Sequence, residues 1–195
     1  MPAPGAQFGS LVGVNYAYAV IISTGGGSAY AMATLNAGWC ARWTATSVDD
    51  IKSVRLSWIT ISAPGTNGIT MRIETVDTTT GKPTGTLYDV NATITFTAAI
   101  GIQTYTFATL PTTGLTVGAE YAIVLLTVVA GTTQTLGSHS VNSAFSVYPT
   151  VVLTAADGTI RTNFTEVAAS IPYCSLVDEN NIERPGAFLP ITTSI

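Results

Sequence analysis

A single histidine is the most direct candidate for catalysis in this chain. A serine hydrolase needs a histidine that is held by a carboxylate and faces a nucleophile. His139 lies between Ser138 and Ser140, but no Asp or Glu occurs between Glu120 and Asp157. On a strand, each flanking serine would point to the face opposite His139. We therefore predict no catalytic residue here and expect His139 to be an ordinary polar residue of a strand or loop.

The carboxylates offer a second kind of chemistry, because glycosidases use a pair of Asp or Glu side chains that flank the sugar bond. Glu74, Asp77, Asp89 and Glu120 could converge if distant strands came together. However, Asp77 and Asp89 flank predicted turns, where Asp is favoured for its hydrogen bonds to the nearby backbone. Glu74 shares a strand face with Arg72, which predicts an exposed ion pair. The pattern favours structural roles, and the protein is predicted not to be an enzyme.

No metal or cofactor is predicted. One histidine and two distant cysteines cannot supply the three or four ligands of a zinc site. Calcium needs clustered oxygen ligands, and the two acidic stretches, 49–50 and 178–180, lack the alternating spacing of a calcium loop. The second stretch fits a solvated turn better.

Cys40 and Cys174 are too few to form a disulfide framework. Two buried free thiols are the favoured interpretation. A single bridge that ties the start of the domain to its end remains the alternative.

Aromatic residues suggest a binding function of another class. Sugar-binding modules stack pyranose rings on exposed aromatic side chains, and Tyr30, Trp39 and Trp43 could form such a platform. Aromatic residues on one face of a strand are more often part of a core, and this interpretation is favoured.

The elements that carry these residues follow a period of two, which is typical of strands. Val54, Leu56 and Trp58 alternate with polar neighbours, and the same alternation recurs over 69–74 and 92–97. Turn-forming sequences separate the strands at Pro64-Gly65, Asn67-Gly68, Gly81-Lys82-Pro83 and Asp157-Gly158. Short strands with such turns predict an all-β protein, an antiparallel β-sandwich of the jelly-roll type.

Residues 121–129 differ from the other strands because they are apolar at almost every position. A strand that is apolar on both faces is expected in the centre of a sheet, with its outward face covered. We expect this cover to come from an N-terminal arm or from another subunit.

Charge is scarce and unevenly distributed. Charged residues make up 9% of the chain, against about 25% in an ordinary domain. Residues 1–41, 90–119 and 121–156 contain no Asp, Glu, Lys or Arg. Uncharged stretches of this length tend to aggregate unless they are covered, so the distribution predicts a protein that assembles with neighbours.

The change in composition near residue 41 divides the chain. We predict an uncharged N-terminal arm with the first strands over 1–45, and a β-sandwich domain over 46–195. The alternating apolar residues of the arm are the predicted assembly contacts: Val14, Tyr16, Tyr18, Val20 and Ile22.

Two classes of partner are excluded by the same composition. A net charge of −4 with scattered basic residues argues against nucleic acid, which is bound by clustered Lys and Arg. The most apolar runs, 14–22 and 121–130, are far shorter than the roughly 20 residues of a membrane-spanning helix.

Part of the chain, residues 47–130, resembles a jelly-roll sandwich module. The strand at 53–58 (SVRLSW) is similar to the first strand of that module. Residues 72–77 (RIETVD) followed by 81–87 (GKPTGTL) resemble its D…GxPxGxL hairpin, and 115–125 (LTVGAEYAIVL) resembles its L-x-x-G-x-x-Y-x-[IV]-V strand. Such modules occur in bacteriophage virion proteins, as capsid decoration or tail fibre, and in carbohydrate-binding-like domains. The resemblance implies the fold, and either of these two settings.

The start of the chain favours the virion setting. Met1-Pro-Ala-Pro-Gly lacks the positive segment of a signal peptide, so we expect no export signal. The expected protein is a non-enzymatic structural component of a virion, assembled in the host cytoplasm. Its expected partners are other copies of itself and another virion protein such as the major capsid protein. The alternative is a carbohydrate-binding module that takes a host glycan on exposed aromatic residues. Within the virion setting, the sequence does not distinguish capsid decoration from a tail or fibre role.

Overall fold

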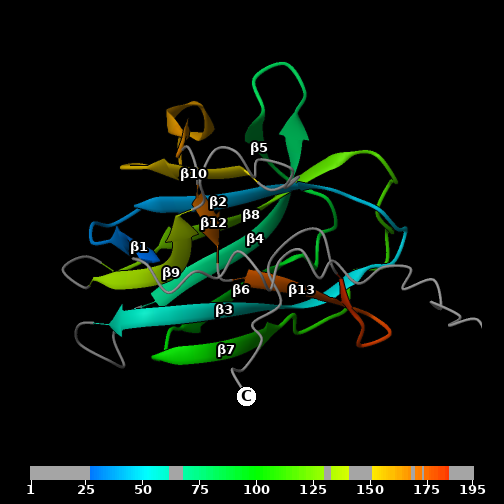
Figure 1. Cartoon of the computed structure of the whole chain (residues 1–195). Helices are drawn as coiled ribbons and strands as arrows, with labels where there is room; N and C mark the ends of the chain where they lie inside the picture. Colours follow the sequence, from blue (N-terminus) through cyan, green and yellow to red (C-terminus); the bar gives the residue numbers. More distant parts are fainter. Residues whose placement is uncertain are drawn as a thin grey trace, which may run out of the picture.

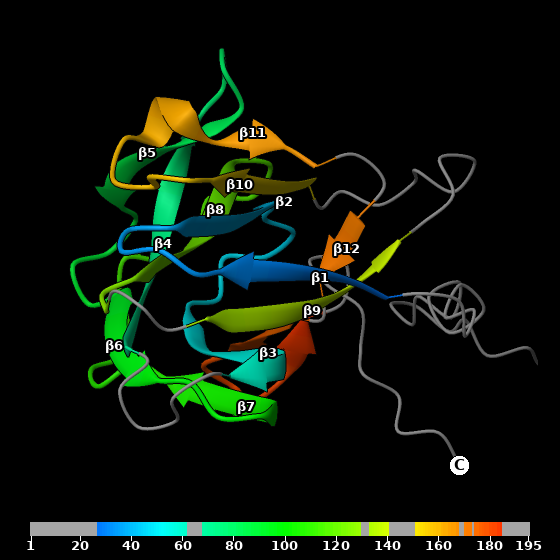
Figure 2. The ribbon, with the colours of Figure 1, turned by 90° about the vertical axis from the view of Figure 1, so that its left-hand side faces the viewer.

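Two antiparallel sheets pack face to face in the computed structural model, which describes residues 27–61, 68–129, 133–140, 151–167, 170–172 and 174–184 (Figure 1; Figure 2). The predicted all-β sandwich is confirmed. The helical content of the described residues is one turn of 3-10 helix, η2 (Arg161–Asn163). No helix within those ranges is long and apolar enough to span a membrane.

Each sheet has seven strands within the described part of the chain. Sheet A contains β1 (Gly27–Met32), β3 (Ile51–Ile61), β7 (Gly101–Thr106), β9 (Gln134–Ser140), β12 (Ser170–Pro172), β13 (Cys174–Asp178) and β14 (Glu183–Arg184). Sheet B contains β2 (Gly38–Thr44), β4 (Gly68–Asp77), β5 (Lys82–Leu87), β6 (Thr93–Thr97), β8 (Glu120–Thr127), β10 (Val151–Ala155) and β11 (Thr165–Glu166).

The strand pairs are nested along the sequence. β2 pairs with β10, β3 with β9, and β4 with β8, while β6 and β7 lie at the turning point of the nest. Consecutive strands from β2 to β4 and from β6 to β10 alternate between the sheets. The chain is therefore one long antiparallel hairpin rolled around a shared core, which is the connectivity of a jelly roll.

The first two described strands belong to this sandwich. β1 pairs with β9 at one side of sheet A, and β2 lies inside sheet B between β10 and β8. The first strands of the predicted unit 1–45 are thus parts of the two sheets. The predicted assembly contacts lie outside the described residues: Val14, Tyr16, Tyr18, Val20 and Ile22.

The main core lies between the sheets and follows the predicted alternation. Val54, Leu56 and Trp58 of β3 are almost fully buried, and so are the inward residues of β4 and β8. The indole Nε1 of Trp58 donates a hydrogen bond of 2.9 Å to the Tyr105 hydroxyl across the neighbouring strand. Because Tyr105 accepts this bond, the polar atom of the buried tryptophan carries little desolvation cost.

A second, smaller core covers the outward face of sheet B. Cys40 of β2, Val124 of β8 and Leu153 of β10 pack there with Phe164, which follows η2. The outward face of β8 is therefore covered by a segment of the same chain, residues 156–164. The expected cover by an arm or by another subunit is wrong for these residues, because the return from β10 to β11 folds back over the sheet.

Candidate functional site

The predicted sugar platform does not exist as an exposed surface. Trp39 is 0% exposed and Trp43 is 3% exposed, and both belong to the main core. The ring of Trp43 packs against that of Tyr121 at 5.9 Å between centroids. A sugar cannot reach either indole, so the core interpretation of these two residues is confirmed. Tyr30 pairs with Leu136 through its backbone, and its side chain lies outside the described residues.

His139 lies on β9, where its backbone pairs with Gly27 and with Ile171. Its side chain lies outside the described residues.

The predicted turn roles of two carboxylates are confirmed. Asp77 accepts hydrogen bonds from the Thr79 amide at 2.8 Å and from the Thr80 hydroxyl at 3.0 Å. Asp89 accepts from the Thr113 hydroxyl at 2.6 Å and from the Asn91 amide at 2.7 Å. The hydrogen bond from Thr113 is the largest cause that lowers the pKa of Asp89 to about 2. These groups hold loops in place and stay ionised.

Both cysteines are free and buried, Cys40 in sheet B and Cys174 in sheet A. The favoured interpretation, two buried free thiols, is therefore confirmed. Burial raises the pKa of both thiols, which disfavours the reactive thiolate. Within the described ranges, no group of three or more His, Cys, Asp or Glu side chains is arranged to hold a metal ion.

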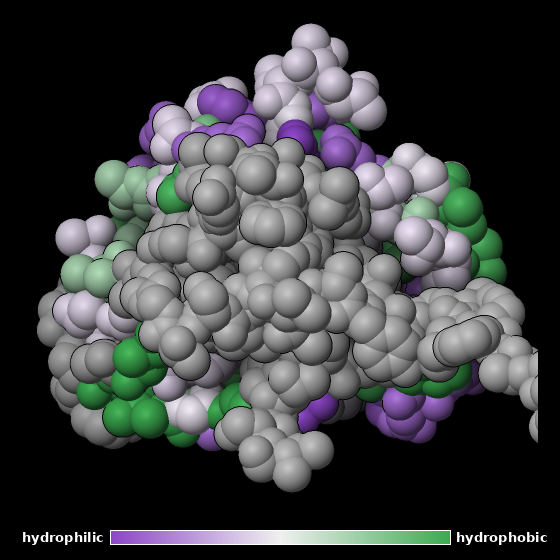
Figure 3. Space-filling model, in the orientation of Figure 1, coloured by the Kyte–Doolittle hydropathy of each residue, from purple (hydrophilic) through white to green (hydrophobic). Residues whose placement is uncertain are grey.

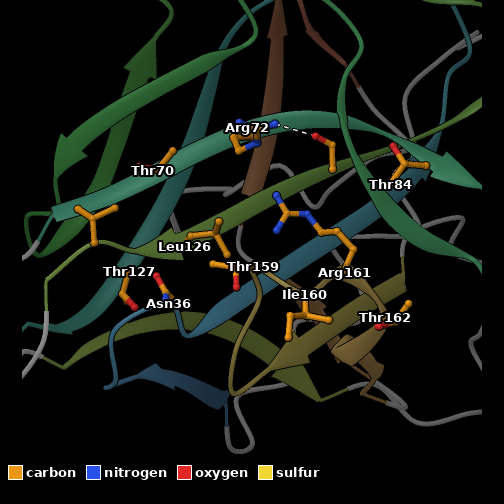
Figure 4. A pocket seen from close by; sticks show the side chains of 12 residues that line it. Asn36, Thr70, Arg72, Thr84, Leu126, Thr127, Thr159, Ile160, Arg161 and Thr162 are labelled. Atoms are coloured by element: carbon orange, nitrogen blue, oxygen red, sulfur yellow. Dashed lines mark hydrogen bonds between the residues drawn. The ribbon is translucent and has the colours of Figure 1, made fainter.

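A groove of about 580 Å³ lies on the outward face of sheet B. Its floor is formed by β4 and β8, and its walls by β5 and by residues 159–162 (Figure 4). Arg72 points up from the floor and Arg161 reaches toward it from the wall. Both arginines therefore lie on the same groove.

In the sequence, 88 residues lie between Arg72 and Arg161, and the return of segment 156–164 over sheet B brings the two side chains together.

Glu74 lies beneath the two arginines and joins them. Its side chain is 0% exposed, while those of Arg72 and Arg161 are 26% and 14% exposed. Arg72 Nε donates to Glu74 Oε1 at 2.7 Å. Arg161 donates to both carboxylate oxygens, from Nη2 at 2.5 Å and from Nε at 2.8 Å. The Gly85 amide donates a further hydrogen bond to Glu74 Oε2 at 2.8 Å. Four hydrogen-bond donors thus hold a carboxylate that is buried away from water.

The pKa of Glu74 follows from these contacts. Burial alone would raise it, but hydrogen bonds from Arg161 and then from Arg72, with their positive charges, bring the pKa below its ordinary value. The predicted ion pair between Arg72 and Glu74 is confirmed. Its predicted exposure is wrong, because segment 156–164 covers Glu74 and contributes Arg161 as a second partner.

Two glycines allow this segment to lie so close to the sheet. A Cβ on Gly158 would lie 2.6 Å from Leu126 Cδ2 and 2.9 Å from Gly38 Cα. The Gly158 amide donates to the Asn36 carbonyl at 2.8 Å, which ties the segment to the start of β2. The sequence indicated only a turn at Asp157-Gly158, and nothing local to it shows that the turn docks on another glycine.

The lining of the groove is positively charged. Among the described residues that line it, the charged side chains are Arg72 and Arg161, with no Asp or Glu. The buried Glu74 balances one of these charges, which leaves a local charge of +1 in a chain of net charge −4. Arg72 also donates from Nη2 to the Gly85 carbonyl at 2.9 Å (Figure 4), while its Nη1 has no partner among the described residues.

In comparisons with protein-family models, with curated proteins and with solved structures, nothing matches the chain.

Proposed function

We propose that this protein is a non-enzymatic structural component of a virion, a bacteriophage capsid decoration or a tail or fibre component. It acts as one copy in an assembly held by neutral, apolar surfaces. The observation that carries the proposal is the edge of sheet A at β7. Within the described ranges, β7 pairs with β3 on one side and has no strand on the other.

This edge lacks the features that normally prevent strands from associating. Natural edge strands are blocked by charges, by proline or by bulges. β7 has none of these in its sequence, GIQTYT, and it belongs to the uncharged stretch 90–119. Ile102 is 41% exposed on β7, and Ile100 just before it is 63% exposed. Ile59 of β3, which is 47% exposed, is a diagonal neighbour of Ile102 on the same face.

These three isoleucines form a neutral apolar patch, the β7 patch, at one end of β3 and β7. Hydrophobic surface is visible at the lower left of the molecule in Figure 3, where these strand ends lie in Figure 1. A second copy of the chain is the occupant we propose, since two β7 edges can pair antiparallel about a twofold axis. The residues of the arm, Val14 to Ile22, are the other proposed contact.

The solution test is the mass of the full chain by light scattering over a range of concentrations. The expected result is reversible self-association that Ile102→Lys weakens, because a lysine must be desolvated at the new interface. Val117→Lys is the matched control, since Val117 is 58% exposed and lies in the loop before β8. A chain that stays monomeric at every concentration contradicts the assembly proposal.

The virion setting needs its own test. Antibodies against the chain should label purified virions from its source at regular positions in electron micrographs. Label that stays with the soluble fraction of the host, and not with particles, would contradict the virion proposal while leaving self-association standing.

A further inference from the structure

We infer that the groove on sheet B binds an acidic sugar, with the sugar carboxylate seated against Arg72 and Arg161. This site is separate from the β7 patch, which lies on sheet A, and it does not depend on assembly. A volume of about 580 Å³ lies within the range of small-molecule sites, roughly 300–1,000 Å³.

The charge of the groove selects an anion. Two guanidinium groups and no carboxylate are found among the described lining residues, so the local field favours a negative ligand. Arg161 is fixed by its two bonds to Glu74 and by a further bond from Nη1 to the Gly158 carbonyl. Because Glu74 holds both arginines in place, a ligand does not have to order their long side chains. The Nη1 of Arg72 is a donor for the incoming carboxylate.

The rest of the lining suits a sugar better than a simple anion. Sugars present hydroxyl groups around a ring that also has apolar faces. Thr70 lies on the floor and Thr84 on the β5 wall, and their hydroxyls bond to Thr95 at 2.9 Å and to Thr75 at 2.7 Å. Each hydroxyl keeps a lone pair that can accept from a sugar hydroxyl.

Apolar side chains complete the surface. Leu126 on the floor and Ile160 on the wall lie beside the arginines (Figure 4). They offer contact to the face of a sugar ring, while the Asn36 amide at the end of the groove offers a polar partner. Shape, charge and hydrogen-bonding groups thus point to the same class of ligand.

The test is a titration of the full, isotope-labelled chain with glucuronate, followed by NMR. Glucose is the neutral analogue, and inorganic phosphate is the anion without a sugar ring. The expected result is saturable shifts of the Gly85 amide and of the Arg161 Nε–H with glucuronate, and weaker or no shifts with glucose and phosphate. Shifts that are as large and as tight with glucose, or with phosphate, would overturn the proposal, and so would no shift with glucuronate.

A matched pair of variants locates the site. Ile160→Glu places a negative charge on the groove wall and should weaken glucuronate binding roughly tenfold. Ile182→Glu adds the same charge in the turn between β13 and β14. Both isoleucines are 52% exposed, so neither variant disturbs the core. Equal binding by the two variants would overturn the assignment to this groove.

Discussion

Replacing Glu74 by glutamine should destabilise the fold much more than the loss of a charge from an exposed ion pair. The substitution keeps the size of the side chain and removes its negative charge. Arg161 and Arg72 would then face each other across a neutral amide, with the Arg72 and Arg161 side chains only 26% and 14% exposed. The amide also offers one acceptor oxygen in place of two, so its NH₂ group must face a donor from Arg161 or Gly85.

The size of the effect can be bounded from these contacts. Removing one partner of a buried ion pair typically costs about 3–5 kcal/mol, because the remaining charge is left without compensation. The arginines here are partly exposed and can recover some hydration, which places the expected loss at about 3 kcal/mol. A second change, Arg161→Met, should restore part of that loss, since it removes one of the two uncompensated charges.

The measurement is urea unfolding at pH 7 followed by circular dichroism. Glu120→Gln is the control, because Glu120 pairs with Arg42 at 3.5 Å and its side chain is 32% exposed. An exposed pair of this kind is worth about 0–1 kcal/mol. If Glu74→Gln cost no more than Glu120→Gln, the buried ion cluster would not be a stabilising contact and the reasoning would be refuted.

Acid should act on the same cluster. The pKa of Glu74 is lower in the folded state than its ordinary value of 4.5. Its contribution to stability is therefore complete above pH 4.5 and is lost as the pH falls through the folded pKa. The wild-type free energy of unfolding should fall over this range, and in Glu74→Gln this part of the pH dependence should be absent.

Three further outcomes are expected. Gly158→Ala should destabilise the protein by about 1–3 kcal/mol, because the new methyl group meets backbone on the sheet, and limited proteolysis should then cut near the segment. Thr113→Val should raise the pKa of Asp89 from about 2 by removing its strongest hydrogen bond, and an NMR titration of the carboxyl group measures this. Cys40 and Cys174 should not react with a thiol reagent in the native protein and should react in urea, since both are buried; fast reaction in buffer would contradict their burial.

The strands could be predicted from the sequence because their alternation is local. Val54, Leu56 and Trp58 face the main core, as the period of two predicted for a half-buried sheet. The same alternation placed Arg72 and Glu74 together on the other face of β4, and their pair is confirmed.

The cover over that face could not be predicted. Phe164 and Arg161 lie in a short irregular segment with no periodicity, and its position over sheet B depends on close contact between Gly158 and Gly38. No local pattern links these two glycines, because Gly38 belongs to β2 and Gly158 to the return loop after β10. The groove was missed for the same reason, since it exists only where this segment meets β4 and β5.

The nested order of the strands also determines when the protein can fold during synthesis. In sheet B, Gly38 of β2 pairs with Leu126 of β8 on one side and with Ala155 of β10 on the other. A ribosome must therefore make most of the chain before β2 has both neighbours, and until then its two tryptophans remain uncovered. Contacts between distant parts of a chain form slowly. We expect the nascent chain to expose apolar surface until its last strands close the sheet that its first strands begin.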